Sequence, residues 1–296
     1  MKERVYMILQ TITLQHHDPI EQIRRRYGHE ASSHAFLSLF LWQEEMGLEL
    51  YLMSDMFAVK CKRRGENSWF FPCGREEAVI DFLRQQMAAS TDPLRLCYMR
   101  QEDVELLSRV FPDRFTVNAV PEDDEYLYDR EEQILLQGKD FRHQRNSLNR
   151  LKRKYELKVC EISAENLDAV AFVLERAREK RSETAGTLCS LSTDRTVLEN
   201  WDKLGMNGVI VYADGKPAAI TAGYLISDQM YDISLCRQAF SDPDIAVYVR
   251  HQLFMGIPQT VRLINAEEDL GQEGLRSLKQ GMRPVGLLRM FEGVSR

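Results

Sequence analysis

The stretch from Val261 to Pro284 limits the possible folds of this chain more than any other part of the sequence. It opens with an apolar run, Val261 to Ile264, that is typical of a buried strand. Acidic residues follow, and Asp269 occupies the position of a helix N-cap, where a carboxylate is favoured by the positive end of the helix. Pro284 ends that helix. The sequence therefore predicts a strand, a short acidic turn and a helix, and α/β proteins tend to bind ligands where such strands end.

The predicted helix has an unusual glycine pair in its first turns. Gly271 and Gly274 each cost about 1 kcal/mol relative to alanine inside a helix. Their spacing also bares a strip of backbone, which lets another backbone or a ligand come close. Tight packing of the helix on a sheet and a ligand-facing role both account for this pair. One apolar stripe, expected to be buried, contains Leu275, Leu278 and Met282. Another face of the helix contains Arg276, Lys279 and Arg283.

Length and composition indicate a globular protein of one large or two ordinary domains. The chain has 296 residues, of which 44% are hydrophobic and 28% charged. A net charge of −6 argues against a dedicated nucleic-acid binder on bulk charge alone. We find no signal peptide, and no apolar run is long enough to span a bilayer. The six cysteines form no C-x-x-C pair, so we expect reduced thiols, no metal site and a soluble cytoplasmic protein.

Hydrophobic periodicity predicts two successive sets of mixed elements. The first set consists of helices at 18–27, 33–45, 75–87 and 102–111 and strands at 48–53, 56–61, 68–71 and 94–99. The second set consists of strands at 157–162, 209–213, 218–225, 230–236, 261–264 and 285–290 and helices at 164–180, 193–204 and 245–255, besides the helix before Pro284. Asp214-Gly215 predicts a hairpin turn. The second order resembles that of the GNAT acyltransferase fold. We therefore predict a mixed α/β class with two tandem GNAT-like acyltransferase domains, residues 1–137 and 138–296.

The segment between the two sets is strongly polarised in charge. Acidic residues crowd residues 122–132, and basic residues dominate 139–154. The basic part predicts an amphipathic helix with an apolar stripe of Phe141, Leu148, Leu151 and Tyr155. Its opposite side contains Arg142, Arg145, Asn146, Asn149 and Arg153. Two interpretations stand: a solvated helix paired with the preceding acids, or a docking surface for a polyanion such as RNA or anionic phospholipid.

Two motifs together resemble a known family. Residues 126–131 (YLYDRE) and 138–152 (GKDFRHQRNSLNRLK) resemble the signature Y-x-Y-x-x-E … G-K-x-x-x-x-x-R-N-x-x-N-x-F-K. Residues 265–279 (NAEEDLGQEGLRSLK) resemble a second signature, N-x-E-x-D-x-G-x-x-G-L-R-x-x-K. Both signatures are those of a bacterial family of unknown function that is related to the C-terminal catalytic region of phosphatidylglycerol lysyltransferases. The chain departs from the family at Leu235-Cys236-Arg237 and at Gln252.

The resemblance implies a tandem GNAT fold and kinship with enzymes that move an aminoacyl group from aminoacyl-tRNA to a lipid or peptide. Ordinary GNAT enzymes hold the coenzyme A pyrophosphate on a glycine-rich loop before a helix. Here residues 237–246 contain no glycine, and Asp242, Pro243 and Asp244 disfavour a bound phosphate. We therefore expect no cofactor, with coenzyme A disfavoured but not excluded. We expect these 296 residues to contain no counterpart of the large membrane domain of the lysyltransferases, which leaves the acceptor open.

Aminoacyl transfer needs a bound polyanionic donor, stabilisation of an oxyanion and a proton acceptor. We assign candidate catalytic roles to Asn265, Glu268, Asp269 and Arg276. The candidate substrate-binding residues are Tyr128, Lys139, Arg142, Arg145, Asn146, Asn149, Arg153, Arg237, Gly271, Gly274 and Lys279. Purely structural roles, such as Asp269 capping its helix and Arg276 pairing with Glu273 or Glu268, account for these residues equally well.

Three functions remain open. The first is transfer of an aminoacyl group from aminoacyl-tRNA, without coenzyme A, to a lipid, peptide or small-molecule acceptor. The second is a non-catalytic module on a GNAT fold that binds a polyanion, and the third is a coenzyme-A-dependent N-acyltransferase. The expected partner is aminoacyl-tRNA or another polyanion, with peripheral contact to anionic lipid. The oligomeric state is open.

Overall fold

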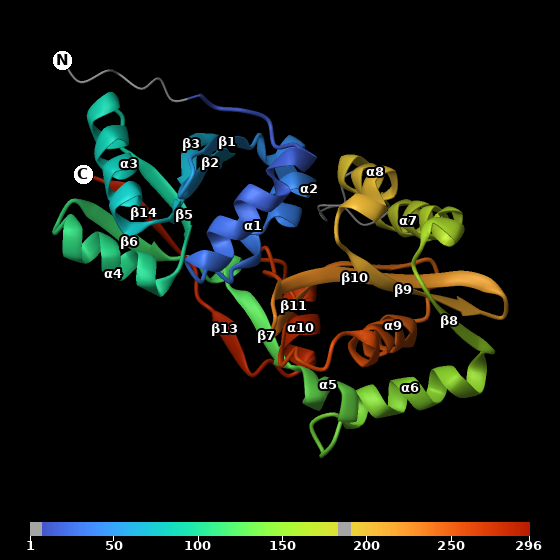
Figure 1. The fold of residues 1–296 in the computed structure, drawn as a ribbon. Helices are drawn as coiled ribbons and strands as arrows, with labels where there is room; N and C mark the ends of the chain where they lie inside the picture. Colours follow the sequence, from blue (N-terminus) through green and yellow to red (C-terminus); the bar gives the residue numbers. More distant parts are fainter. Residues whose placement is uncertain (1–7, 183–190) are drawn as a thin grey trace. The chain divides into compact units, whose positions relative to one another are not determined.

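The computed structural model describes residues 8–182 and 191–296, which form two compact units (Figure 1). The first unit consists of Met1–Glu125 and Leu288–Arg296, and the second of Tyr126–Leu287. The boundary expected after residue 137 thus lies inside the second unit. The C-terminal residues, which we had assigned to the second domain, belong to the first.

The first unit is built on a mixed sheet with the strand order β1-β2-β3-β5-β14-β6. Strands β3 and β5 run parallel, and the other pairs are antiparallel. The last strand of the chain, β14, lies between β5 and β6, because Phe291 pairs with Met99 on one side and with Ala119 on the other. The strands are β1 (Glu49–Leu52), β2 (Met56–Arg63), β3 (Glu66–Phe70), β4 (Cys73–Gly74, paired with β2), β5 (Arg95–Met99), β6 (Phe115–Ala119) and β14 (Phe291–Ser295).

Helices cover both faces of this sheet, and the alternation along β2 shows why. Phe57 and Val59 point into one apolar cluster, and Met56 and Ala58 point into another. The first cluster is completed by α1 (His17–Arg26) and α2 (Phe36–Met46), and the second by α3 (Glu76–Ala89) and α4 (Gln101–Val110). A strand segment with both faces buried is expected to be apolar, as Met56 to Val59 of β2 are.

The second unit also contains a mixed sheet, with the order β13-β7-β12-β11-β10-β9-β8. Its parallel pair is β11 with β12, and it joins Met230–Asp232 to Leu263–Asn265. The pairing stops there, so β11 continues past the end of β12. Asp214 and Gly215 both adopt positive φ between β9 and β10, which confirms the predicted hairpin turn. The strands are β7 (Glu125–Asp129), β8 (Leu157–Glu161), β9 (Asn207–Ala213), β10 (Lys216–Ser227), β11 (Met230–Gln238), β12 (Leu263–Asn265) and β13 (Gly286–Leu288).

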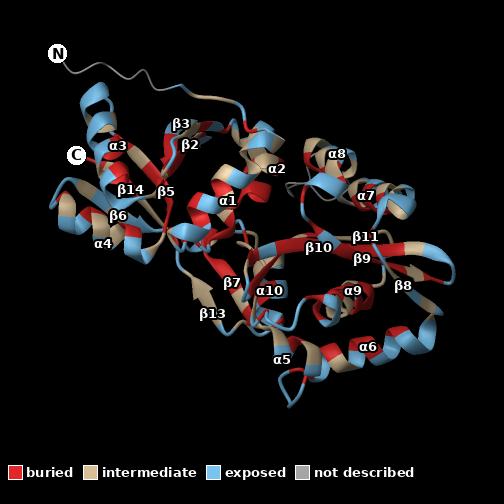
Figure 2. Cartoon of the chain, viewed as in Figure 1, coloured by how far each residue is buried: buried red, intermediate tan, exposed pale blue. Residues whose placement is uncertain are grey.

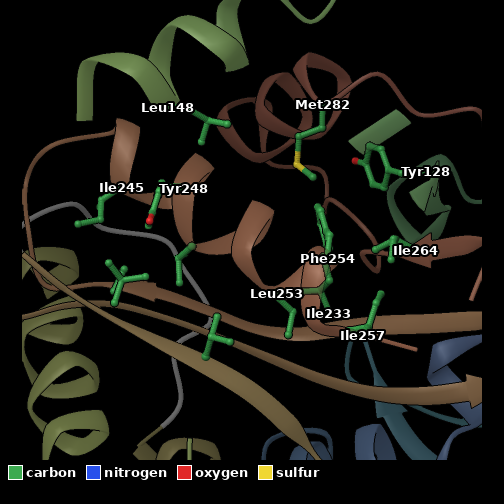
Figure 3. Close-up of a cluster of buried hydrophobic side chains, with 14 of the residues drawn as sticks. Tyr128, Leu148, Ile233, Ile245, Tyr248, Leu253, Phe254, Ile257, Ile264 and Met282 are labelled. Atoms are coloured by element: carbon green, nitrogen blue, oxygen red, sulfur yellow. The ribbon is translucent and has the colours of Figure 1, made fainter. Parts of the chain in front are cut away.

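The core of the second unit lies between this sheet and helix α9 (Figure 3). Ile245, Val249 and Leu253 form the buried side of α9, as their spacing predicted. Helix α6 packs on α9 through Leu148 and Leu151, while α7 covers the opposite face of the sheet (Figure 1). The helices are α5 (Arg130–Leu135), α6 (Arg142–Lys154), α7 (Leu167–Ser182), α8 (Leu191–Asn200), α9 (Asp244–Gly256) and α10 (Glu273–Gly281).

The predicted mixed α/β class is confirmed, with two mixed sheets. Strands β6, β7 and β14 and helix α5 are additions that the periodicity did not predict. Of the cysteines, Cys61, Cys73 and Cys97 are buried, and Cys189 lies outside the described residues. A search for membrane spans, restricted to the described residues, finds no helix with the length and apolar character that crossing a bilayer requires.

Candidate functional site

The chain turns sharply where β12 ends, before helix α10 begins. Asn265 is fully buried, and its side-chain oxygen accepts a hydrogen bond of 2.8 Å from the amide of Glu267. Glu267, Leu270 and Gly271 all adopt positive φ, which only glycine does without strain. Helix α10 then starts at Glu273. The prediction that both glycines lie in the helix is therefore wrong, because Gly271 belongs to the turn before it.

Asp269 is the centre of this turn. Its carboxylate accepts four hydrogen bonds: 2.8 Å from the Tyr126 hydroxyl, 2.9 Å from the Gly271 amide, and 2.8 and 3.0 Å from Nε and Nη2 of Arg276. Burial alone would raise the pKa of Asp269, but the hydrogen bonds from Arg276 and Tyr126 outweigh it and lower the pKa. The predicted N-cap role is wrong, because Gln272 precedes the helix. Asp269 instead closes an Asx turn and binds Arg276, so the expected pairing of Arg276 with Glu273 or Glu268 is wrong.

The apolar stripe that we predicted on α10 is wrong at Leu278. Leu278 is 46% exposed, whereas Lys279 is buried. The Lys279 ammonium donates to the carbonyl oxygen of Ala266 at 2.5 Å and to that of Glu268. Burial lowers the pKa of Lys279, and the nearby carboxylates of Glu268 and Glu267 oppose that effect. Because the turn leaves these two carbonyl groups without a place in a sheet or helix, a buried donor from α10 stabilises it.

Side chains in and next to the first signature form hydrogen bonds with the backbone of the second signature and of the end of α10. Tyr128, which we listed as a binding residue, is fully buried, and its hydroxyl donates to the Lys279 carbonyl at 3.0 Å. Gln144 donates to the Gly281 carbonyl, and Gln133 donates to the Met282 carbonyl, each at 2.7 Å. The end of α10 has carbonyl groups that the backbone amides of the helix do not fully satisfy, and these side chains donate to them. The two signatures thus form one connected structure within the second unit.

Helix α6 carries a row of polar residues at exposed positions, and much of its ribbon is coloured as exposed in Figure 2. Arg142, Asn146, Asn149 and Arg153 are all exposed. Arg145 is half-buried and donates through Nη1 to the carbonyl groups of residues 136 and 138. Within the described ranges, ion pairs involve neither Arg142 nor Arg153, nor the exposed Lys139 in the loop before α6.

Other basic side chains of α6 are paired with the start of α9. Arg150 binds Asp244 at 2.7 Å, and Lys154 binds Asp242 at 2.7 Å. These bonds lower the pKa of both carboxyl groups, and Asp242 also accepts from the amide of Asp244 at 3.1 Å. The N-terminus of α9 is therefore already occupied by two carboxylates of the chain itself, which a phosphate would have to displace.

The acidic block before α6 has other partners than the helix. Asp123 is buried against Arg63, Asp124 is buried against Arg289, and Glu125 accepts from the amide of Ser32 at 2.9 Å. All of these partners lie in the first unit. The expectation that this block pairs with the basic helix is therefore wrong for residues 123–125.

Strand β11 carries two groups of interest, one near its start and one near its end. Asp232 is fully buried opposite Asn265 in the parallel pair and accepts from the Ser234 hydroxyl at 2.8 Å. We missed Asp232, although a carboxylate inside the apolar run of a strand was a readable signal. Arg237, a predicted binding residue, donates to the Cys236 carbonyl at 3.1 Å, and its buried Nε has no hydrogen-bond partner among the described residues. No cluster with metal-ligand character exists in residues 8–182 and 191–296.

Comparisons with known proteins agree with this geometry. The sequence model described as "Phosphatidylglycerol lysyltransferase, C-terminal" matches residues 24–289. A conserved protein of unknown function from Bacteroides thetaiotaomicron has a crystal structure with a TM-score of 0.89 to this chain, at 21% identity, over 98% of this chain and 100% of that one. No curated protein matches the chain.

Two further solved structures share the fold. The C-terminal domain of a putative lysylphosphatidylglycerol synthetase from Agrobacterium fabrum has a TM-score of 0.67 at 14% identity, over 95% of this chain and 92% of that one. L-PGS from Bacillus licheniformis has a TM-score of 0.65 at 17% identity, over 94% and 91%. At these identities the structures establish the fold, and the match of the sequence model establishes the family. The chain belongs to the family of phosphatidylglycerol lysyltransferase C-terminal regions, which is of acyltransferase type.

Proposed function

We propose that the chain transfers an aminoacyl group from aminoacyl-tRNA to a lipid, peptide or small-molecule acceptor, and that it does so on two tandem GNAT-like units. Each unit has a mixed sheet with one parallel strand pair among antiparallel neighbours, and this arrangement supports the tandem interpretation. Membership of an acyltransferase-type family supports the reaction class.

The exposed row on α6 is the observation that carries the proposal. Arg142 and Arg153 keep their charges free of ion pairs within the described part of the chain, and Asn146 and Asn149 lie between them. Four side chains on one line of a helix fit the repeating phosphates and polar edges of an RNA strand. The paired Arg150 and Lys154 serve the fold instead.

The start of α9 supports a donor other than coenzyme A. Asp242 and Asp244 fill the position at which a helix N-terminus would bind a pyrophosphate. Two carboxylates there oppose the binding of a phosphate. The ester of an aminoacyl-tRNA needs no such site, because its phosphates lie along the nucleic-acid backbone.

For the chemistry we assign the turn after β12. The acceptor amine or hydroxyl attacks the ester carbonyl, and the tetrahedral oxyanion accepts a hydrogen bond from the exposed side of Arg276, while the buried Asn265 holds the turn. Glu268 takes the proton of the attacking group, and the 3′-oxygen of the tRNA leaves with a proton. Asp269 orients Arg276. Gly274 is exposed and a Cβ added there would meet no atom within 4 Å, so close packing within the chain does not require this glycine.

Binding is tested with matched double variants of α6. Arg142→Gln with Arg153→Gln should weaken tRNA binding at least about tenfold and reduce the salt dependence of log Kd by about 1.5. Arg150→Gln with Lys154→Gln removes the same charge from the same helix, and we expect lower thermal stability with little change in the salt dependence. Equal effects of both pairs on binding would contradict the proposal.

Turnover separates the proposed function from its alternatives. The chain should deacylate tRNAs charged with radiolabelled amino acids in the presence of an acceptor, and Glu268→Gln should slow this reaction. A polyanion-binding module would shift the mobility of tRNA without deacylating it. Tight binding of coenzyme A in calorimetry would support coenzyme-A-dependent N-acyl transfer instead.

A further inference from the structure

A buried histidine in the first unit lacks the partners that such a group normally has. The side chain of His29 is 2% exposed, and neither ring nitrogen has a hydrogen-bond partner among the residues described. Its ring lies 3.9 Å from that of His34, centroid to centroid. His34 is satisfied, with Nε2 2.8 Å from the Phe71 carbonyl oxygen and Nδ1 3.0 Å from the Ser33 hydroxyl. Buried polar groups without partners are rare, so the His29 ring calls for an explanation.

His29 lines a cavity of about 280 Å³. The cavity lies where the parallel strands β3 and β5 separate, because the residues after each strand, Phe71 to Gly74 and Arg100, form part of its wall. Tyr27 and the first turns of α3 and α4 complete the wall. Its volume is near the lower end of small-molecule sites, which begin at roughly 300 Å³.

The inner part of the cavity favours an anionic group. Burial lowers the pKa of His29 well below its usual value, and the neighbouring His34 ring adds to the effect. The guanidinium groups of Arg100 and Arg24 lower it further. The ring is therefore neutral and carries one N–H donor, which is free to donate to an anionic group. Arg100 itself lines the cavity, donates to the Gly28 carbonyl at 3.2 Å and pairs with Asp103.

The solvent side of the same cavity is acidic. Glu102 and Glu105 line it, both are exposed, and neither forms an ion pair within residues 8–182 and 191–296. Glu76 is neutralised by Arg109 at 2.8 Å. The lining thus combines donors at the buried end with uncompensated carboxylates at the exposed end.

We propose that this cavity binds a small zwitterion of the α-amino-acid class. The carboxylate accepts a hydrogen bond from the His29 ring beside Arg100, and the ammonium group faces Glu102 and Glu105. Every residue of this site belongs to the first unit, so the inference does not depend on the tRNA surface or on the turn after β12.

The test measures binding of each standard L-amino acid to the full chain by calorimetry. NMR of the imidazole nitrogens then follows the His29 ring. At least one amino acid should bind and shift the His29 resonances. Its amine without the carboxylate and its acid without the amine should each bind at least about tenfold more weakly. No binding up to tens of millimolar, or equal binding of a one-charge analogue, would overturn the proposal.

Variants separate recognition from folding. His29→Leu should lose binding at least about tenfold while its melting temperature stays equal or rises, because a group without partners is removed. His34→Leu is the matched control and should melt lower, because two hydrogen bonds are lost. Glu102 and Glu105 lie on the surface, and the double variant Glu102→Gln with Glu105→Gln should weaken binding of the amino acid but not binding of its deaminated acid. The control variant Glu49→Gln on β1 should change neither affinity. Unchanged binding in His29→Leu would refute the assignment.

Discussion

Replacement of Asp269 by asparagine should destabilise the second unit rather than only slow a reaction. Asparagine has nearly the same shape, but it is neutral and presents an amide group to donors. At least two of the four hydrogen bonds to the carboxylate are then lost, including one from Arg276. Hydrogen bonds to charged groups contribute about 1.5–3 kcal/mol each.

The net loss is smaller than this sum, because Arg276 is 41% exposed and water solvates it when the pair breaks. Tyr126 is buried, so its hydroxyl regains little. We expect a loss of about 3 kcal/mol in the free energy of unfolding. In a unit of this size that lowers Tm by roughly 6–12 °C.

Fluorescence offers a measurement specific to the second unit. Trp201 is buried there, and Trp42 and Trp69 belong to the first unit. The substitutions Trp42→Phe and Trp69→Phe leave Trp201 as the single tryptophan reporter for thermal and urea unfolding. Combined with Arg276→Gln, the double-mutant cycle should show that the two changes are not additive, because each removes the same ion pair. A variant that melts within about 1 °C of the parent and no longer deacylates aminoacyl-tRNA would refute the reasoning, because the carboxylate would then serve the chemistry alone.

Three further perturbations test the fold. Burial lowers the pKa of His34 from 6.5 to about 3, so between these pH values only the unfolded chain binds the proton. The contribution of His34 to stability is therefore complete above pH 6.5, and acidification to pH 5 should lower the free energy of unfolding by about 2 kcal/mol. Urea unfolding of the parent, compared with His34→Leu at both pH values, measures this loss. Gly223→Ala should cost about 3 kcal/mol or prevent folding, judged by Tm and soluble yield, because its Cβ would lie 1.7 Å from the Asp232 carbonyl oxygen. Deletion of residues 288–296 should unfold the first unit and leave the Trp201 signal native, because β14 is lost from the middle of a sheet; unchanged unfolding would contradict that placement.

Local patterns predicted the elements whose environment is set by their own sequence. Helix α9 has its buried side at the predicted spacing because a sheet lies under its whole length. The Asp214-Gly215 turn follows from backbone preference alone. Strands β6 and β14 could not be predicted in this way, since residues 291–295 pair with strands almost two hundred positions earlier in the chain.

Charge was the less reliable guide to burial. Asp123 and Asp124 looked like solvated residues, but each is buried against a distant arginine. Lys279 replaces Leu278 on the buried side of α10 because a turn with two carbonyl groups needs a donor there. Within the candidate site, the two signatures predicted which residues lie close together in the fold. The hydrogen bonds of Tyr128 and Asp269 give these two residues structural roles. No sequence pattern pointed to His29, because a single histidine in a loop belongs to no hydrophobic periodicity and to no motif.

The position of β14 affects how the protein is made. A ribosome releases β5 and β6 long before it translates residues 291–295, so both strands wait with an unpaired edge in the nascent chain. The second unit is contiguous and can finish folding as soon as it emerges. The two units therefore complete their folding in the opposite order to their synthesis. The first unit, most of which is made first, depends longest on protection from aggregation.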